Sequence, residues 1–222
     1  MHVDMEYGSG YGFPWIKHGL GPNYVSASLL TIVNLLAHMD LFTVSAVAEK
    51  IQKDLKFENE EWKVGFLQTV NYISMGVSSP LWGVLGDKIS RKCIIIFALI
   101  FWSLTVLISS LAPSYEMLAT FQALVGVGYA GFAINAPSVI KDLFDNPETE
   151  KDESHRYLFG KSETKMKAVV SLWLAIYTYP KPIGVGLGFV WASSIDKSSG
   201  WRWAIRSTIF ISWSLAIILL VF

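Results

Sequence analysis

Long apolar runs separated by charged segments make up most of this sequence. Several runs approach or exceed the roughly 20 residues that an α-helix needs to cross the hydrocarbon core of a bilayer. The pattern predicts an all-α membrane protein, with a tail at 1–23 and a six-helix transmembrane domain at 24–222. A polar loop is expected at 141–167, and the transmembrane helices are expected at 24–48, 62–86, 93–112, 117–140, 168–195 and 201–222.

Composition agrees with a membrane protein and weakens other classes. The 222 residues are 52% hydrophobic and only 16% charged, whereas charged residues make up about a quarter of soluble domains. The formal net charge is zero, so we expect no nucleic-acid partner. The 4 histidines lack metal-ligand spacing, and the sequence has no phosphate-binding loop or catalytic triad in a supporting context. We therefore expect that the protein is not an enzyme and uses no metal or cofactor.

The distribution of positive charge predicts how the helices are oriented in the bilayer. The segment 83–92 joins two apolar runs and carries three cations against one acid. Such a segment cannot enter lipid, so we predict a tight turn at a membrane face, and its excess of Lys and Arg predicts the cytoplasmic side. Alternation of six helices then places the loop at 141–167 and both chain termini on the same side.

The segment 83–92 also resembles a family signature. The loop between helices 2 and 3 of the major facilitator superfamily has the pattern G-x-L-G/A-D-[RK]-x-x-R-[RK]. The matching positions in this sequence are Gly83, Leu85, Gly86, Asp87, Lys88, Arg91 and Lys92. The resemblance implies the N-terminal half-bundle of a major facilitator fold, with Asp87 and Arg91 in a gate. The alternative is a capped turn that only sets the topology.

Further stretches resemble a narrower group within the superfamily, the spinster-like branch. Its members are proton-linked exporters of sphingolipids and lysophospholipids in lysosomal, late endosomal and plasma membranes. The resemblance implies a transporter that works by alternating access, with membrane lipid, a lipid-like substrate and protons as its partners. The stretches that carry it lie at 34–44, 124–128, 136–144, 182–188 and 200–206.

Most ionisable residues that the spinster-like branch places inside the bundle are replaced. Where the branch usually has an Arg on helix 1 and an Arg and a Glu on helix 4, this chain has Leu41, Gln122 and Tyr129. Asp40 remains, and a buried carboxyl without a cation favours its neutral form. We expect Asp40 to bind a proton or to orient the substrate, although the replacements weigh against the branch's mode of proton coupling. Lys181, a new cation on helix 5, is a candidate partner for Asp40.

Uncharged polar side chains in the predicted spans mark further candidates, because they are costly in lipid and should face the bundle interior. His38 is expected to be a hydrogen-bonded interior residue, with a proton relay as the alternative. Some of the others lie on one helix face, where they either line a substrate cavity or bond between helices. The candidates for lining a cavity are Asn34, Gln68, Asn71, Tyr72, Gln122 and Tyr129.

Prolines predict interruptions in two of the helices. The step Asn135-Ala136-Pro137 should loosen or end helix 4, since Pro lacks the N–H that continues the hydrogen-bond ladder. The step Pro180-Lys181-Pro182 should interrupt helix 5 near its middle. A broken helix at membrane depth is tolerated only where it lines protein or a cavity.

Six helices are half of the twelve that a major facilitator contains. The sequence therefore favours an incomplete or half-size transporter, which would act as a homodimer or pair with a second half. The alternative is a non-transporting remnant, or a regulatory membrane protein of the same fold. A channel or a membrane enzyme with six helices is a third hypothesis, and only the interrupted helix 5 is compatible with it.

Overall fold

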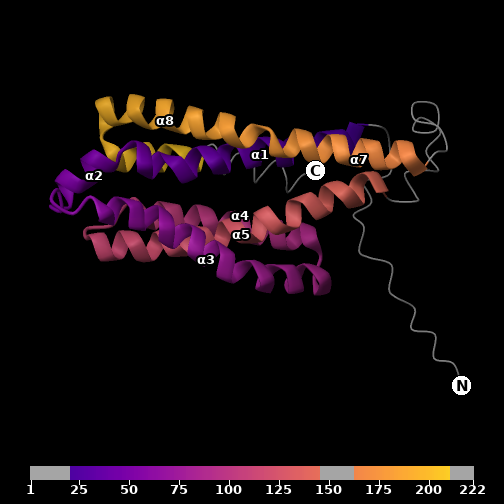
Figure 1. Ribbon diagram of the computed structural model, residues 1–222, viewed down its shortest axis with the longest axis horizontal. Helices are drawn as coiled ribbons and strands as arrows, with labels where there is room; N and C mark the ends of the chain where they lie inside the picture. The colour runs from indigo at the N-terminus through magenta and orange to yellow at the C-terminus, as the bar shows by residue number, and fades with distance from the viewer. Residues whose placement is uncertain (1–20, 146–162, 211–222) are drawn as a thin grey trace, which may run out of the picture.

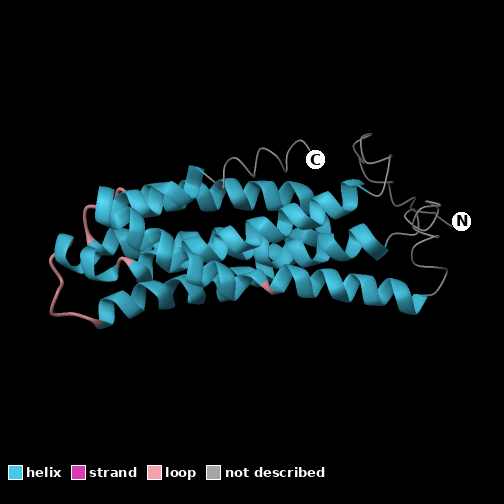
Figure 2. Ribbon diagram, turned by 90° about the horizontal axis from the view of Figure 1, so that it is seen from above, coloured by secondary structure: helices cyan, strands magenta, loops and turns pink. Residues whose placement is uncertain are grey.

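The computed structural model describes residues 21–145 and 163–210, and these residues form a bundle of long helices that run along one axis (Figures 1 and 2). The residues it describes contain no strand. A helical segment at 201–210 follows the last labelled helix. The labelled helices are α1 (Gly21–Ala46), α2 (Ala48–Asp54), α3 (Trp62–Lys88), α4 (Arg91–Ser109), α5 (Tyr115–Asp145), α7 (Glu163–Thr178) and α8 (Pro180–Ser199).

Three described helices are long and apolar enough to cross a membrane, namely Asn23–Ala46, Arg91–Ser109 and Tyr115–Phe144. Helix α3 is also long, with 27 residues. Helices α7 and α8 follow one another along one line beside α1 (Figure 1). The segment 201–210 is a further helical part of the bundle. The prediction of an all-α membrane fold is confirmed. The predicted tail up to residue 20, the loop at 146–162 and the end of helix 6 at 211–222 lie outside the described residues.

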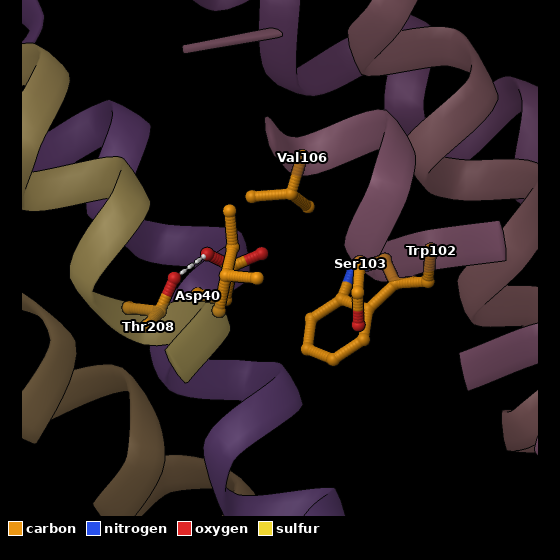
Figure 3. A pocket seen from close by; sticks show the side chains of 6 residues that line it. Asp40, Trp102, Ser103, Val106 and Thr208 are labelled. Carbon is orange, nitrogen blue, oxygen red and sulfur yellow. Dashed lines mark hydrogen bonds between the residues drawn. The ribbon is translucent and has the colours of Figure 1, made fainter. Parts of the chain in front are cut away.

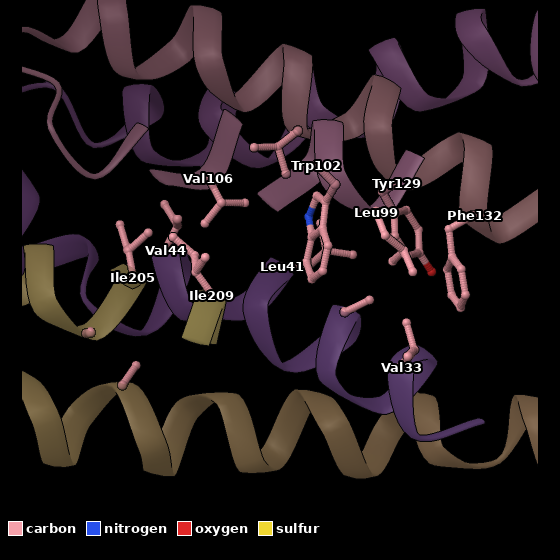
Figure 4. Close-up of a cluster of buried hydrophobic side chains, with 14 of the residues drawn as sticks. Val33, Leu41, Val44, Leu99, Trp102, Val106, Tyr129, Phe132, Ile205 and Ile209 are labelled. Carbon is pink, nitrogen blue, oxygen red and sulfur yellow. The ribbon is translucent and has the colours of Figure 1, made fainter. Parts of the chain in front are cut away.

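The long helices pack in two groups, one of α3, α4 and α5 and the other of α1, α7 and α8, and α5 connects them. Helices α3 and α4 both pack on α5, α1 packs mainly on α8, and α5 also contacts α1 and α7. A core of buried apolar side chains fills the space between α1, α4, α5 and the segment 201–210 (Figure 4). Leu41, which stands where the resemblance predicted an Arg, lies in this core and is 5% exposed.

Glycines allow the closest helix contacts in the bundle. A Cβ at Gly188 of α8 would collide with the backbone carbonyl of Met39, and one at Gly184 would collide with that of Leu35. On the other side of the bundle, a Cβ at Gly126 of α5 would collide with the backbone of Asn71. Small residues are suited to such contacts, because association within a membrane depends on close packing rather than on hydrophobic burial.

A tight turn joins α3 and α4 within the segment 83–92, as predicted, but it is shorter than the turn expected between helices at 62–86 and 93–112. Helix α3 continues to Lys88 and α4 begins at Arg91, so only residues 89–90 lie outside the helices. Gly86 is helical and packs against α5, where an added Cβ would collide with the side chain of Asn135. The bounds of the turn differ from the prediction because glycine is compatible with a turn and equally with close helix packing.

The two helix interruptions that the prolines predicted have different outcomes in the structure. Helix α5 continues through Pro137 to Asp145, so the expected end near Pro137 is wrong and the first residues of the predicted polar loop are helical. Burial on both sides of Pro137, at Ala136 and Ile140, holds this part of the helix in place. In contrast, helix 5 is interrupted between α7 and α8 as predicted, but only at Tyr179, whose backbone stays helical at φ −57° and ψ −37°. Two prolines two residues apart remove two N–H donors there, against one in α5.

Candidate functional site

Asp40 is buried on the face of α1 that points toward α4 and the segment 201–210. Asp40 is 5% exposed and lines a small pocket with Trp102, Ser103, Val106, Thr208 and Ile209 (Figure 3). None of the described residues that line this pocket is basic. The site therefore combines one carboxyl and two hydroxyl groups with apolar and indole walls.

Thr208 is the hydrogen-bond partner of Asp40. The Thr208 hydroxyl oxygen lies 2.5 Å from Asp40 Oδ1 and 2.8 Å from the backbone carbonyl oxygen of Ile205. A hydroxyl group has only one proton to donate. Both contacts are satisfied together when Asp40 carries a proton, donates it to Thr208, and Thr208 donates its own proton to Ile205. The geometry therefore suits a neutral carboxyl group at Asp40.

His38 lies two residues before Asp40 but faces α5 and α8. Its Nδ1 is 2.8 Å from the backbone carbonyl oxygen of Asn34, and its Nε2 is 3.2 Å from the hydroxyl oxygen of Tyr129. A carbonyl can only accept, so Nδ1 carries the proton and Tyr129 donates to Nε2. The two rings meet edge to face at a centroid distance of 5.6 Å. His38 is thus held between α1 and α5 in one tautomer.

Lys181 lies in the first turn of α8 and is half-buried. It precedes Gly184 by one helical turn, and a Cβ added to Gly184 would lie 3.1 Å from His38 Cβ. The structure shows no ion pair between Lys181 and Asp40, and Asp40 bonds to Thr208 instead. Among the described residues, Lys181 has no acidic partner, so this cation is available on the His38 side of α1.

Most of the other cavity candidates make hydrogen bonds between helices. Asn34 Nδ2 donates to the carbonyl oxygen of Tyr177 at 2.7 Å, which joins α1 to α7. Asn71 Nδ2 donates to the carbonyl oxygen of Gln122 at 3.0 Å, which joins α3 to α5. Gln122 Nε2 in turn donates to Ser109 at 3.3 Å. These contacts favour the hydrogen-bonding alternative for Asn71 and Gln122.

Gln68 and Tyr72 differ from these buried amides. Ser45 of α1 donates to the side-chain oxygen of Gln68 at 3.3 Å, and Tyr72 is 45% exposed.

Three buried amide atoms have no hydrogen-bond partner in the described part of the chain, and each would cost about 1–3 kcal/mol if it stayed so. These atoms are Asn34 Oδ1, Asn71 Oδ1 and Gln68 Nε2. Water or a polar group of a ligand can supply the missing hydrogen bonds.

The signature residues form a second candidate site at one end of the bundle. Arg91 Nη1 of α4 donates to Asp142 Oδ2 of α5 at 2.6 Å, and Arg91 Nη2 lies 3.9 Å from Asp87 Oδ1 of α3. Lys88 is exposed and Lys92 is half-buried. Three helices therefore meet at Arg91. A Cβ added to Gly83 would have no neighbour within 4 Å.

Comparison with known proteins decides the family. The family model described as Major Facilitator Superfamily matches residues 30–222. The chain belongs to the major facilitator superfamily. It is therefore an integral membrane protein with several membrane-spanning helices, and the match includes Asp40, the signature residues and the segment 201–210.

Curated relatives within the superfamily have spinster names. The chain is 32% identical over 186 residues to Protein spinster of Drosophila melanogaster, covering 83% of this chain and 27% of that protein. It is 33% identical over 184 residues to Sphingosine-1-phosphate transporter SPNS2 of Xenopus tropicalis, covering 82% and 31%. The zebrafish (Danio rerio) protein of the same name is 34% identical over 202 residues, covering 89% and 35%. The chain thus spans about a third of the length of these relatives.

The sequence did not reveal the partners of Asp40 and His38 in this superfamily member. Thr208 lies 168 positions from Asp40, and a hydroxyl inside an apolar run carries no local signal. Tyr129 was a candidate for lining a cavity, but its bond to His38 spans 91 positions. Such pairings follow from helix packing and have no pattern along the chain.

Proposed function

We propose that this chain forms part of a secondary transporter that moves lipid-like solutes, of the sphingolipid or lysophospholipid kind, by alternating access. Membership of the major facilitator superfamily and similarity to proteins named spinster support the proposal. The observation that carries it is the buried carboxyl group of Asp40 between α1 and the segment 201–210. An ionisable group inside a membrane bundle is costly and is a functional hypothesis by default.

Asp40 is proposed to couple transport to protons. With a proton, Asp40 donates to Thr208 while Thr208 donates to Ile205. Without the proton, the Thr208 hydroxyl group has one hydrogen and cannot donate fully to both the carboxylate and the Ile205 carbonyl oxygen. Loss of the proton thus changes the contact between α1 and the segment 201–210, which can bias the bundle toward another state.

The polar head of the substrate is proposed to bind on the opposite face of α1, beside His38. Lys181 has no acidic partner among the described residues and can balance a phosphate group there. Tyr129 and Asn34 hold the His38 ring, and Tyr72 is exposed to a ligand that enters along α3. The apolar part of an amphiphilic substrate would contact the exposed apolar side chains of α3 and α8.

A second six-helix bundle is proposed to complete the transporter, either as a second copy or as a second half. Three glycines of α3 have no neighbour within 4 Å of an added Cβ: Gly65, Gly76 and Gly83. Exposed small residues let another helix approach closely in a membrane. The alternative function, a non-transporting membrane protein of the same fold, is favoured by the use of Asn71 and Gln122 in bonds within the bundle.

Replacement of Asp40 by asparagine tests the transport proposal. Asn keeps the shape and remains neutral at every pH, so uptake of a labelled lysophospholipid into liposomes should no longer depend on pH. Asp196→Asn is the control, since it removes a carboxyl group near the end of α8. If Asp40→Asn has the pH profile of the wild type, Asp40 has no role in proton coupling. If neither protein transports, alone or with a second half, the non-transporting alternative is favoured.

A further inference from the structure

Two arginines one helical turn apart in the segment 201–210 have different surroundings. Arg202 Nη1 donates to Asp54 Oδ2 of α2 at 2.5 Å, and Arg202 Nη2 donates to the carbonyl oxygen of Ala112 at 3.3 Å. Its guanidinium carbon also lies 4.4 Å from the centroid of the Trp201 ring. The charge of Arg202 is therefore balanced by an acid within the protein.

Arg206 has no acidic partner among the described residues. Its Nε donates to the hydroxyl oxygen of Ser110 at 3.0 Å, and its guanidinium carbon lies 5.4 Å from the centroid of the Trp203 ring. These two contacts fix the plane of the guanidinium group and leave its Nη donors free to bind a ligand. A fixed fork of N–H donors matches the oxygens of a phosphate group.

The position of Ser110 shows where along the bundle this guanidinium group lies. Ser110 is the C-cap of α4, so the group is level with the end of that helix. Side chains on a helix lean toward its N-terminus, which for the segment 201–210 is the end beside Gly200. The charge of Arg206 is thus directed toward the same end of the bundle.

The surface around Arg206 is apolar and suited to lipid contact. Trp203 and Phe210, on the same helical segment, are 49% and 66% exposed, and Leu111, next to Ser110, is 55% exposed. In an integral membrane protein such a surface faces the bilayer, with Trp side chains at the interface between lipid and water. Phosphate groups of lipids are the anions found at that depth.

We propose that Arg206, held by Ser110 and Trp203, binds the phosphate group of a membrane phospholipid at this end of the bundle. The site is separate from both faces of α1 that serve the proposed transport. Its preferred ligand is a phospholipid whose head group carries no cation, such as phosphatidylglycerol. A lipid bound there would bridge the end of α4 and the segment 201–210.

Native mass spectrometry of the purified chain tests this site with three probes: phosphatidylglycerol, diacylglycerol, which lacks the phosphate, and inorganic phosphate. The expected result is phosphatidylglycerol binding that weakens about tenfold in Arg206→Gln, since the charge-assisted hydrogen bonds to the phosphate are lost. The affinity of Arg206→Lys for phosphatidylglycerol should lie between those of the wild type and Arg206→Gln, because lysine keeps the charge but lacks the paired N–H donors of the guanidinium group. Lys197→Gln is the control, because it removes a cation from the last turn of α8 at the same end of the bundle.

Equal binding of phosphatidylglycerol by the wild type and Arg206→Gln would overturn the proposal. So would binding of diacylglycerol as tight as that of phosphatidylglycerol, or of inorganic phosphate as tight as that of the lipid. If Arg206→Gln does not fold, Ser110→Ala takes its place, since it keeps the charge of Arg206, removes the hydroxyl group to which Nε donates and should weaken binding several-fold. Because the assay measures lipid binding and no flux, its result does not depend on whether the chain transports.

Discussion

The two sides of α1 place ionisable groups in contrasting surroundings. On one side, Asp40 lies among the apolar side chains of α4 and the segment 201–210, with Thr208 as its partner. On the other side, His38 belongs to a chain of hydrogen bonds that includes Asn34 and Tyr129. A change of charge is costly in the first setting, because few groups can compensate for it. In the second, neighbouring donors and acceptors compensate for it.

This difference separates two roles that the sequence placed on one helix. A group in an apolar pocket responds strongly to gain or loss of a proton, which suits coupling to a proton gradient. A hydrogen-bonded histidine beside Lys181, which has no acidic partner among the described residues, suits recognition of a polar head group. Helix α1 is placed to connect the two roles, because movement of the helix on one side changes its contacts on the other.

The free energy of unfolding should be most sensitive to mutation at the contact between α1 and α8, on the His38 side of α1. In Gly188→Ala the new methyl group would collide with the carbonyl of Met39, which cannot move without shifting α1. We expect a loss of about 1–3 kcal/mol in the free energy of unfolding. Gly186→Ala is the matched control on the same helix, since a Cβ at Gly186 has no neighbour within 4 Å. It should be neutral or stabilising by up to about 1 kcal/mol. Thermal unfolding in detergent measures both.

Equal stability of these two alanine variants would show that α1 and α8 are not in close contact. The comparison between the two sides of α1 would then lose its basis, since His38 is placed by the same contact: a Cβ at Gly184 would lie 3.1 Å from His38 Cβ.

The Asp40 side should be sensitive to the loss of one hydroxyl group. Thr208→Val keeps the shape of the side chain but removes the partner of Asp40, and we expect a loss of about 1 kcal/mol in unfolding free energy. Thr208→Ser retains the hydroxyl and serves as the control. In the transport assay, Thr208→Val should change the dependence of uptake on pH while Thr208→Ser retains it. If uptake by Thr208→Val depends on pH as in the wild type, Thr208 takes no part in proton binding at Asp40.

Hydropathy was sufficient to predict the fold, because apolar runs of membrane-spanning length have few alternatives. It was not sufficient for local details. Gly86 and Pro137 each suggested the end of a helix, yet both lie inside helices, where packing against neighbouring elements outweighs local preference. In contrast, the break at Tyr179 was predictable, because two nearby prolines remove donors that packing cannot replace.

The candidate site was predictable only in part. Asp40 and His38 stood out because ionisable side chains are costly inside an apolar run. Which side of α1 each one faces depends on the packing of the other helices. The suggested pair of Asp40 with Lys181 failed for that reason, since the two lie on different sides of α1 and Thr208 occupies the position beside Asp40.

The smallest expected effect comes from the hydroxyl group of Tyr129. Tyr129→Phe removes the donor to His38 Nε2 and leaves the ring contact at 5.6 Å in place. We expect a loss of about 0.5 kcal/mol in unfolding free energy, because the contact is long at 3.2 Å, together with weaker binding of the substrate and an unchanged dependence of uptake on pH. Tyr72→Phe is the control for the change in unfolding free energy alone, because Tyr72 is 45% exposed and has no hydrogen bond to another described residue. A changed pH profile in Tyr129→Phe would instead make His38 part of the proton pathway, and the two sides of α1 would then act as one site.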